Sequence, residues 1–587
     1  MTGTMTQTLE PRGGHEHATN PPAPPPAPTS FAQEQLWLLD RLIPQRQAYN
    51  VPGRFRLRGA LDRELTARTL RALMERHPAL RTAMIEDDGD LWQHVRPTSA
   101  VPVPLDWHDL RGLAEAERAE RERELALAEA AAPFDLDRAP LWRAVLVRTA
   151  EQEHVLLLTL HHIITDGWSI QLFLDEFCQL YAALAAGLPS PLAPLAGSPA
   201  ASAQRQRELL RTGGLDRERA YWRAELAGAP ATMPALAGRP RPAKPSYRGA
   251  AVEFTLPTEL VERTEALGRR LRASPFMVFL AAFETVLLRC TGRTDILVGT
   301  PTSGRGGPDE EKLFGFFVNS LPLRTDLSGS PSFVDAVKRI RATTLAALDH
   351  QALPFEEIVR ESAGRRGISH HPVFQVLFAL TLLQENAEFG ALTIEPLPTA
   401  RTGTAKFDLA MMLYRSASGM RGAVEFATDL FDRDRVERLV ELWTALLAAV
   451  LADPELPVDS DLLPHPAPED LAAPDEQPPT GVPAAPTTAP ETADRALLAT
   501  VWREVLGLHT LDPDQDFFDL GGHSLLAMRI TARVGAALDL DLPMTVLFQN
   551  PTLARFCAAV DAALAEADQP APGADEPTTT STSEGQS

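Results

Sequence analysis

The chain has 587 residues, of which 44% are hydrophobic and 23% are charged, a composition typical of a globular protein. One hydrophobic core rarely grows to this length, so several domains are expected. The formal net charge of −22 argues against binding to a nucleic-acid backbone or to an anionic membrane surface, because both require a basic face.

The N-terminal end of the chain, MTGTMTQTLEPRGGHEH, lacks the apolar segment of a signal peptide, and no later window approaches the length of a transmembrane helix. Residues 1–28 are rich in Pro, Gly and Ala and end in PPAPPPAP, so we expect them to be disordered. Cys178, Cys290 and Cys557 are far apart in sequence and provide neither a metal-binding spacing nor a disulfide framework. We therefore expect a cytoplasmic protein.

From Ser30 to about Leu463 the pattern predicts a large α/β body. An aromatic-poor, Pro-containing patch at 188–202 divides this body into lobes of about 29–195 and 203–463. Apolar residues at helical spacing predict a helix at 432–452. Four apolar runs predict strands, at Asp295–Thr300, Val373–Leu380, Lys406–Leu413 and Gly422–Leu430.

The most informative segment follows the apolar run Val155–Leu160, which is short enough for a buried strand. Its end carries His161 and His162, which titrate near neutrality and could act as a base at the edge of a cleft. Asp166 stands close enough to hold the geometry of the same turn, and Gly167 is expected to allow a conformation that a side chain would forbid. The segment is therefore a candidate active site.

A separate block follows the α/β body. Residues 464–490 contain nine prolines and no aromatic residue, which predicts a semi-extended linker. Residues 491–566 then form a small helical bundle. Its predicted helices are Ala493–Leu506, Leu525–Leu538 and Thr552–Ala565. The last residues, 567–587, are expected to be a disordered polar tail.

In the small bundle, two glycines precede His523 and Ser524, and Ser524 opens an amphipathic helix. One interpretation is a helix N-cap, where the hydroxyl accepts a hydrogen bond from a free backbone N–H. The other is an exposed serine that receives a phosphate-containing group, whose negative charge a helix N-terminus stabilises. A hydrolase nucleophile elbow is excluded, because it needs Gly where Leu526 stands.

These segments together resemble a nonribosomal peptide synthetase condensation domain followed by a peptidyl carrier domain. The resemblance extends from Ser30 to about Ala565 and is carried by separated motifs. In the body these are Ser30-Phe31-Ala32-Gln33-Glu34-Gln35-Leu36-Trp37, Arg76-His77-Pro78-Ala79-Leu80-Arg81-Thr82, the segment His161 to Gly167, Gly299-Thr300-Pro301, Gly304-Arg305, Gly315-Phe316-Phe317-Val318-Asn319, His350-Gln351 with Leu353-Pro354-Phe355, and His371-Pro372-Val373-Phe374-Gln375-Val376. In the bundle the motif is Leu520-Gly521-Gly522-His523-Ser524-Leu525.

The resemblance implies an α/β fold: a two-lobed, V-shaped condensation domain similar to chloramphenicol acetyltransferase, plus a small four-helix-bundle carrier domain. It also implies a tunnel in which a donor acyl thioester on an upstream carrier meets an acceptor amine held by 4'-phosphopantetheine on Ser524. His162 is then the expected base or hydrogen-bond positioner, whereas His161 mainly supports the fold. Asp166 is expected to pair with Arg305 of the other lobe, and this pair supports the turn that carries His162.

Two departures from the family pattern stand out. An aromatic, Asp-containing motif is usual before the mid-domain Gln-Arg, but here the stretch 198–205 reads SPAASAQR. The adenylation domain that normally lies between condensation and carrier domains is also missing. The resemblance therefore implies loading by a trans-acting adenylation enzyme, modification by a phosphopantetheinyl transferase, and a downstream release or condensation enzyme.

Other interpretations of the motifs remain. His162 and Asp166 could bind a metal ion, but this requires a helix and a third ligand. The two histidines could be a core pair without chemistry. Within the family, the alternatives are ester formation, capture of a free amine, epimerisation of a carrier-bound residue, and a non-catalytic carrier scaffold.

Overall fold

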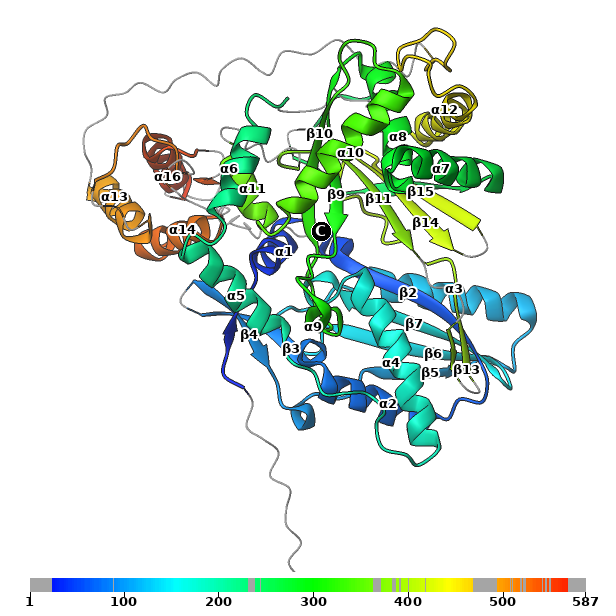
Figure 1. The fold of residues 1–587 in the computed structure, drawn as a ribbon. Coiled ribbons are helices and arrows are strands. Elements are labelled where there is room, and N and C mark those ends of the chain that lie inside the picture. The colour runs from blue at the N-terminus through cyan, green and yellow to red at the C-terminus, as the bar shows by residue number, and fades with distance from the viewer. Residues whose placement is uncertain are drawn as a thin grey trace, which may run out of the picture.

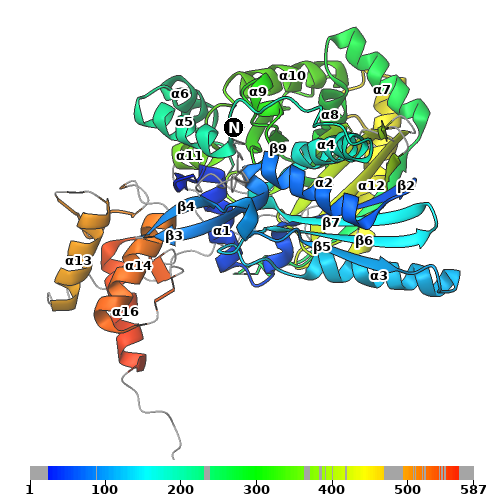
Figure 2. The same cartoon turned by 90° about the horizontal axis from the view of Figure 1, so that it is seen from below.

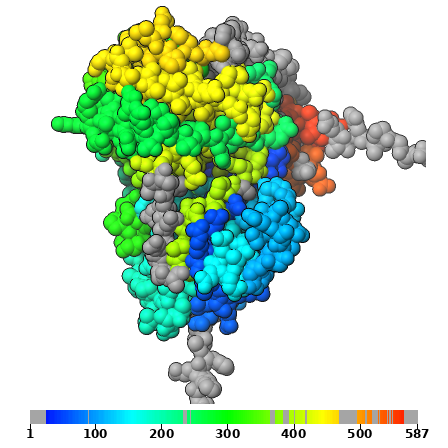
Figure 3. Space-filling view, turned by 90° about the vertical axis from the view of Figure 1, so that its right-hand side faces the viewer, coloured from blue at the N-terminus to red at the C-terminus, as the bar shows by residue number. Residues whose placement is uncertain are grey.

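A computed structural model describes residues 24–87, 89–230, 238–242, 244–362, 371–382, 387–389, 392–399, 401–416, 419–467, 493–506, 508, 510–517, 520, 524–540, 542–543, 546–547 and 550–567. Two six-stranded sheets define two lobes, and a group of helices at the C-terminal end lies beside them (Figure 1). Figure 3 shows the two lobes stacked, with the C-terminal lobe (C-lobe) mainly in green and yellow above the N-terminal lobe (N-lobe), mainly in blue and cyan.

The N-lobe sheet has the strand order β12-β13-β2-β7-β6-β5. Its strands are β2 (Asn50–Arg58), β5 (Leu105–Asp109), β6 (Trp142–Ala150), β7 (Glu153–His161), β12 (Ala387–Phe389) and β13 (Leu392–Pro396). The apolar run that precedes the histidines is buried on both faces of this sheet. Leu156, Leu158 and Leu160 join the core with α2 (Arg63–Arg76) and α4 (Gly167–Ala185), whereas Val155 and Leu157 pack on the side of α3 (Glu115–Ala131).

The C-lobe sheet has the order β10-β9-β11-β14-β15-β8. Its strands are β8 (Gly249–Leu256), β9 (Asp295–Thr302), β10 (Asn319–Asp326), β11 (Val376–Leu382), β14 (Leu409–Ser416) and β15 (Gly419–Ala427). The long helices of its core are α7 (Thr258–Leu271), α8 (Pro275–Thr291), α10 (Phe333–Asp349) and α12 (Arg433–Ala452).

Shorter elements connect and border the lobes. The helices are α1 (Phe31–Leu42), α5 (Pro199–Arg211), α6 (Asp216–Glu225), α9 (Pro308–Glu311) and α11 (Phe355–Glu361), and the 3-10 turns are η1 (Arg46–Tyr49), η2 (Pro78–Arg81), η3 (Thr98–Ala100) and η4 (His162–Ile164). A three-stranded sheet joins β1 (Ala27–Pro28), β4 (Asp90–Val95) and β3 (Thr82–Asp87). The described helices of the C-terminal group are α13 (Ala493–Leu506), α14 (Ser524–Leu538) and α16 (Leu553–Ala567), which share one core.

The predicted elements are found close to their expected positions. The helix at 432–452 corresponds to α12, and the strand at 295–300 to β9. The other three predicted strands correspond to β11, β14 and β15, each displaced by about three residues. Their boundaries shifted because all three are continuous with apolar residues in loops that also pack in the core.

The α/β body begins earlier and ends later in the chain than the sequence suggested. Ala27 and Pro28 were expected to be disordered, but they pair with β4 as strand β1. The linker was expected to begin at Pro464, yet residues 464–467 pack on the C-lobe. The Arg289 side chain holds this segment by hydrogen bonds to the carbonyl oxygens of Leu463 and Pro464.

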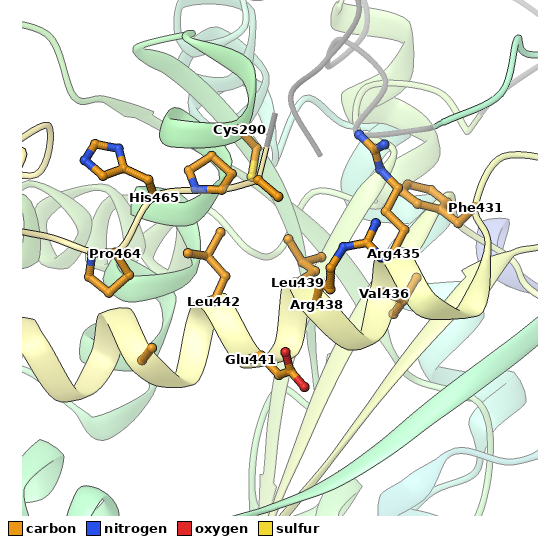
Figure 4. A pocket seen from close by; sticks show the side chains of 13 residues that line it. Cys290, Phe431, Arg435, Val436, Arg438, Leu439, Glu441, Leu442, Pro464 and His465 are labelled. Atoms are coloured by element: carbon orange, nitrogen blue, oxygen red, sulfur yellow. The ribbon is translucent and has the colours of Figure 1, made fainter. Parts of the chain in front are cut away.

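Pro464 and His465 border a pocket of about 320 Å³ beside α12, together with Cys290 and Leu442 (Figure 4). The rest of the expected linker, 468–490, and the expected tail beyond Ala567 lie outside the described residues. The residues that line the pocket include neither His161 nor His162, nor Asp166, nor Arg305, so the pocket is separate from the candidate active site.

The second lobe is also not the continuous segment 203–463 that the sequence suggested. Residues Leu392–Pro396 leave the C-lobe and pair as β13 with β2 of the N-lobe sheet. Sequence patterning cannot reveal such an exchange, because a strand has the same periodicity in either sheet. The exchange ties the two lobes together.

Within the described residues, no single helix is long and apolar enough to cross a membrane. Helices α7 and α8 meet that test only as a pair, which is bent by 106°. Cys178, Cys290 and Cys557 are all buried and form no disulfide, as expected.

Candidate active site

The turn η4 places His162 at the end of β7, where the two lobes meet. Its imidazole Nδ1 lies 2.8 Å from the backbone oxygen of Thr165. Because a carbonyl oxygen can only accept, Nδ1 carries the proton and Nε2 is the nitrogen with the free lone pair. The ring also packs edge-on against Phe316 of the C-lobe, with ring centroids 5.0 Å apart. This contact and the hydrogen bond fix both the tautomer and the direction of the ring.

The environment keeps His162 uncharged. Burial and the positive charge of Lys406 lower the pKa of His162 to about 4, against the opposing effects of the Thr165 carbonyl and Asp166. An imidazole with this pKa is neutral throughout the physiological range. It can accept a hydrogen bond at Nε2, but it is a weak base.

His161 faces the other way and is completely buried. Its Nδ1 accepts a hydrogen bond of 3.1 Å from the backbone N–H of Ile163, so its proton resides on Nε2. That Nε2 lies 3.9 Å from a carboxylate oxygen of Asp40. Burial, followed by the charges of its neighbours, lowers the pKa of His161 to about 3. His161 therefore lies within the protein core.

Asp166 and Arg305 form an ion pair across the lobe boundary. The two Arg305 Nη atoms lie 2.7 Å and 3.2 Å from the two Asp166 carboxylate oxygens, and both side chains are 1% exposed. The Asp166 carboxylate also accepts hydrogen bonds from the backbone N–H groups of Ser169 and Phe317. The first of these caps α4 at its N-terminus. Asp166 thus joins the turn of His162 to α4 and to the C-lobe.

The expectation for Gly167 was wrong. Gly167 is the first residue of α4 and does not have a positive φ, and a Cβ built on it meets no atom within 4 Å. The extended backbone of Asp166, with φ −140° and ψ 179°, already makes the change of direction. A glycine is required instead in the loop between β9 and α9: Gly304, next to Arg305, has φ +62°, and a Cβ on it would lie 1.8 Å from the backbone oxygen of Phe317.

A metal interpretation of His162 and Asp166 does not fit this geometry. His162 Nδ1 and both Asp166 oxygens already have protein partners. The part of the chain that the structure describes contains no cluster of three or more residues able to bind a metal ion.

Other sequence motifs support the same turn. Gln33 of α1 donates a 3.1 Å hydrogen bond to the backbone oxygen of Ile163. Arg76 and His77 both bind Glu176, which lies on α4, at 3.0 Å and 2.6 Å. The motifs at 30–37 and 76–82 therefore position the two elements, α1 and α4, on which the histidine turn rests.

The segment that departs from the family pattern, 198–205, forms the start of α5. Ser198 caps this helix, and Ser202 donates a 2.5 Å hydrogen bond to Glu310 of α9. Arg205 forms an ion pair with the same carboxylate. Polar contacts thus occupy the place where the family pattern has aromatic residues.

Ser524 lies at the N-terminus of α14, in the C-terminal helical group. Gly521, Gly522 and His523, which precede it, lie outside the described residues, and only the backbone of Ser524 is described. A helix N-terminus suits a phosphodiester, because its free N–H groups and the helix dipole attract negative charge. The position of Ser524 therefore fits a covalently attached phosphate group.

The helical group contacts the N-lobe through α14 (Figure 2). Arg529 on this helix lies 2.7 Å from Asp90 and donates a 3.1 Å hydrogen bond to the backbone oxygen of Gly89, in the β3–β4 turn. Gly89 has φ +77°, and a Cβ on it would lie 2.4 Å from the Arg529 side chain. Helix α14 also contacts α1, which on another side contacts the histidine turn η4.

Comparisons with known proteins agree with this architecture. The family model "Condensation domain" matches residues 26–471, and "Phosphopantetheine attachment site" matches residues 496–560. The chain is 42% identical over 433 residues to a linear gramicidin synthase protein of Brevibacillus parabrevis, covering 73% of this chain and 6% of that protein. It is 37% identical over 430 residues to phosphinothricin tripeptide synthetase PhsC of Streptomyces viridochromogenes, covering 73% and 39%. The X-domain from teicoplanin biosynthesis superposes with a TM-score of 0.66 at 30% identity, covering 74% of this chain and 97% of that chain.

The chain belongs to the condensation-domain family of nonribosomal peptide synthetases, and a phosphopantetheine-binding carrier domain follows that domain. The resemblance and the α/β fold class predicted from the sequence are thereby confirmed, as is 4'-phosphopantetheine as the cofactor of the carrier. Only residues 472–495 separate the two matches, which is too few for a further domain. The chain spans well under half the length of either curated relative.

Replacing Asp166 tests whether the ion pair supports the site. Asp166→Ala leaves the Arg305 guanidinium buried without its partner, so the free energy of unfolding should fall by about 3–5 kcal/mol, together with activity. Chemical denaturation followed by circular dichroism measures the first effect. The neighbouring variant Gly167→Ala is the control and should unfold like wild type, since its new methyl group meets no atom. If Asp166→Ala kept the stability and the rate of wild type, the supporting role of the Asp166–Arg305 ion pair would be contradicted.

Proposed function

We propose that this chain forms an amide bond between a donor acyl or peptidyl thioester on a partner carrier and an acceptor amine held on its own carrier domain at Ser524. The observation that carries this proposal is the orientation of His162. Its Nδ1 is held by the Thr165 carbonyl, so Nε2 is left to accept a hydrogen bond at the boundary between the lobes. 4'-Phosphopantetheine on Ser524 would supply a flexible arm that ends in a thiol able to carry an aminoacyl group.

The low pKa of His162, about 4, favours positioning over full proton removal. In the reaction the amine nitrogen attacks the thioester carbonyl, a C–N bond forms and a C–S bond breaks. Nε2 of His162 accepts a hydrogen bond from the amine N–H. This hydrogen bond directs the lone pair of the amine nitrogen at the thioester carbonyl carbon. The proton lost by the amine passes to the leaving sulfur. Orientation of two tethered reactants can by itself supply a large acceleration.

The contact of α14 with the N-lobe supports the use of the chain's own carrier as the acceptor. Arg529 and the β3–β4 turn hold the carrier beside α1, which also supports the histidine turn. The Pro-rich linker expected from the sequence would keep the carrier at an effective concentration on the order of millimolar. Both features favour reaction within one chain.

The proposal requires several partners. A phosphopantetheinyl transferase modifies Ser524, a trans-acting adenylation enzyme loads it, an upstream carrier brings the donor, and a downstream enzyme takes or releases the product. Ester formation or capture of a free amine would use the same site. Epimerisation is disfavoured, because epimerase domains usually follow their carrier domain, whereas in this chain the carrier domain follows.

The alternative to an enzyme is a non-catalytic scaffold that presents a loaded carrier to partner proteins. A structure similar to this chain, at 30% identity and a TM-score of 0.66, is a complex of the teicoplanin X-domain with OxyB. A condensation-like fold can therefore associate with another protein. The intact arrangement of His162, Asp166 and Arg305 favours catalysis here.

Intact-protein mass spectrometry tests the catalytic proposal. The holo chain is loaded with a panel of aminoacyl groups, and a donor-loaded carrier is added. We expect a dipeptidyl mass on Ser524 in wild type, and a rate lower by about 100-fold or more in His162→Ala, because the hydrogen bond to the amine is lost. Ser524→Ala should carry no product. If no pair of substrates gives product, or if His162→Ala matches wild type, catalysis at His162 is excluded.

A charge exchange tests the carrier contact. Arg529→Glu should slow product formation at low salt by about 3- to 10-fold, because it places two carboxylates together, and adding Asp90→Arg should restore much of the rate. Arg533→Glu is the matched control. Arg533 lies on the same helix but pairs with Glu504 of the carrier itself, 3.4 Å away. If Arg529→Glu and Arg533→Glu slowed product formation equally, and Asp90→Arg did not restore the rate of Arg529→Glu, the role of the Arg529–Asp90 contact would be contradicted.

A further inference from the structure

Helix α1 presents a second polar side chain to the histidine turn. Gln33 of this helix donates a hydrogen bond to the backbone oxygen of Ile163. Asp40 follows Gln33 by seven residues and therefore lies on the same face of the helix. Its carboxylate lies beside the imidazole of His161, and the two side chains are 2% and 0% exposed. Gln33 and Asp40 therefore approach the turn from the same element.

Arg46 of η1 orients the Asp40 carboxylate. Its Nε and Nη2 donate hydrogen bonds of 3.3 Å and 3.0 Å to Oδ2 of Asp40. Nη2 also donates a 2.9 Å hydrogen bond to the backbone oxygen of Phe134, whose ring packs edge-on against the His161 imidazole with centroids 6.2 Å apart. Because Arg46 occupies Oδ2, the other oxygen, Oδ1, remains for His161, whose Nε2 lies 3.9 Å away.

These two atoms are a buried donor and a buried acceptor. The backbone N–H of Ile163 donates to His161 Nδ1, so the proton of the imidazole is on Nε2. Among the described residues, neither His161 Nε2 nor Asp40 Oδ1 has a hydrogen-bond partner. Buried polar groups without partners are costly, which favours a bond between two complementary groups that lie so close. Their separation of 3.9 Å exceeds that of a formed hydrogen bond by about 1 Å, so a small movement of either side chain is sufficient.

We infer that Asp40 is a positioning residue of the condensation reaction: its Oδ1 accepts the Nε2–H of His161 and thereby keeps Nδ1 as the acceptor for the backbone N–H of Ile163. This inference rests on the proposed function and adds a residue to it. Ile163 directly follows His162, and α1 then holds both of its backbone polar groups, the carbonyl through Gln33 and the N–H through Asp40 and His161. The opposite tautomer of His161 would set a ring N–H against the N–H of Ile163 and release the turn that orients His162.

NMR of the imidazole nitrogens tests the hydrogen bond without requiring turnover. Histidines are labelled with ¹⁵N in the full chain, and the His161 signals are identified by their loss in His161→Gln. In wild type we expect the proton on Nε2, with a downfield N–H signal that exchanges slowly with solvent, because this proton is buried and bound to a carboxylate. A wild-type His161 that is protonated on Nδ1, or whose Nε2–H has the shift of a free imidazole, would overturn the inference.

Asp40→Leu removes the acceptor and keeps a side chain of similar size. Arg46 is 47% exposed and retains its bond to Phe134, so this variant leaves no buried unpaired charge. The Nε2–H signal of His161 should move upfield or give way to the Nδ1-protonated form. Asp137→Leu is the matched control, because Asp137 pairs with Arg41 of the same helix at 3.6 Å and is half exposed. An unchanged His161 signal in folded Asp40→Leu would overturn the inference, as would the same change in Asp137→Leu.

Kinetics separate this inference from the proposed function. In Asp40→Leu we expect kcat to fall by about 10-fold or more, because misplacement of His162 impairs the orientation of the amine. The KM for the donor-loaded carrier should stay at the wild-type value, since a buried carboxylate cannot touch a carrier, and Asp137→Leu should match wild type in both constants. A wild type that forms no product would refute the proposed function and leave the NMR result standing. An active Asp40→Leu with altered His161 signals and unchanged kcat would refute the positioning role.

Discussion

The ion pair between Asp166 and Arg305 holds the end of β7, the start of α4 and the C-lobe in one arrangement. Two buried charges lose their hydration, and such a pair is stable only where additional hydrogen bonds satisfy the remaining atoms. Here the backbone N–H groups of Ser169 and Phe317 bind the carboxylate, and the Leu313 carbonyl binds the guanidinium. The direction in which His162 points depends on this cluster, because the histidine lies four residues before the aspartate.

The electrostatics around the site follow from the same pairing of charges. Carboxylates close to the turn are matched by arginines, and His161 is too deeply buried to ionise. What remains is an imidazole that burial keeps neutral and whose Nδ1 is held by the Thr165 carbonyl. Such a group binds and orients an amine well and removes its proton poorly. The proposed reaction would therefore rely on the geometry of two tethered reactants.

Sequence alone predicted the parts governed by periodicity and local motifs. The run Val155–Leu160 indicated a buried strand, and helix α12 matched its prediction within a residue. The role expected for Gly167 was wrong, because a glycine's conformation depends on its neighbours, and here Asp166 makes the turn. The transfer of β13 to the other sheet is a tertiary contact, which no spacing in the sequence encodes.

The carrier domain lies against α1, so one helix contacts both α14, which begins at Ser524, and the histidine turn η4. The central claim is that His162 acts on the amine held at Ser524 of the same chain. The most direct measurement mixes loaded His162→Ala chains with Ser524→Ala chains at about 1 μM and follows the dipeptidyl mass. We expect the mixture to form the dipeptidyl product at least about 100-fold more slowly than wild type, because each chain lacks one half of the intramolecular reaction. A mixture as fast as wild type would contradict this claim.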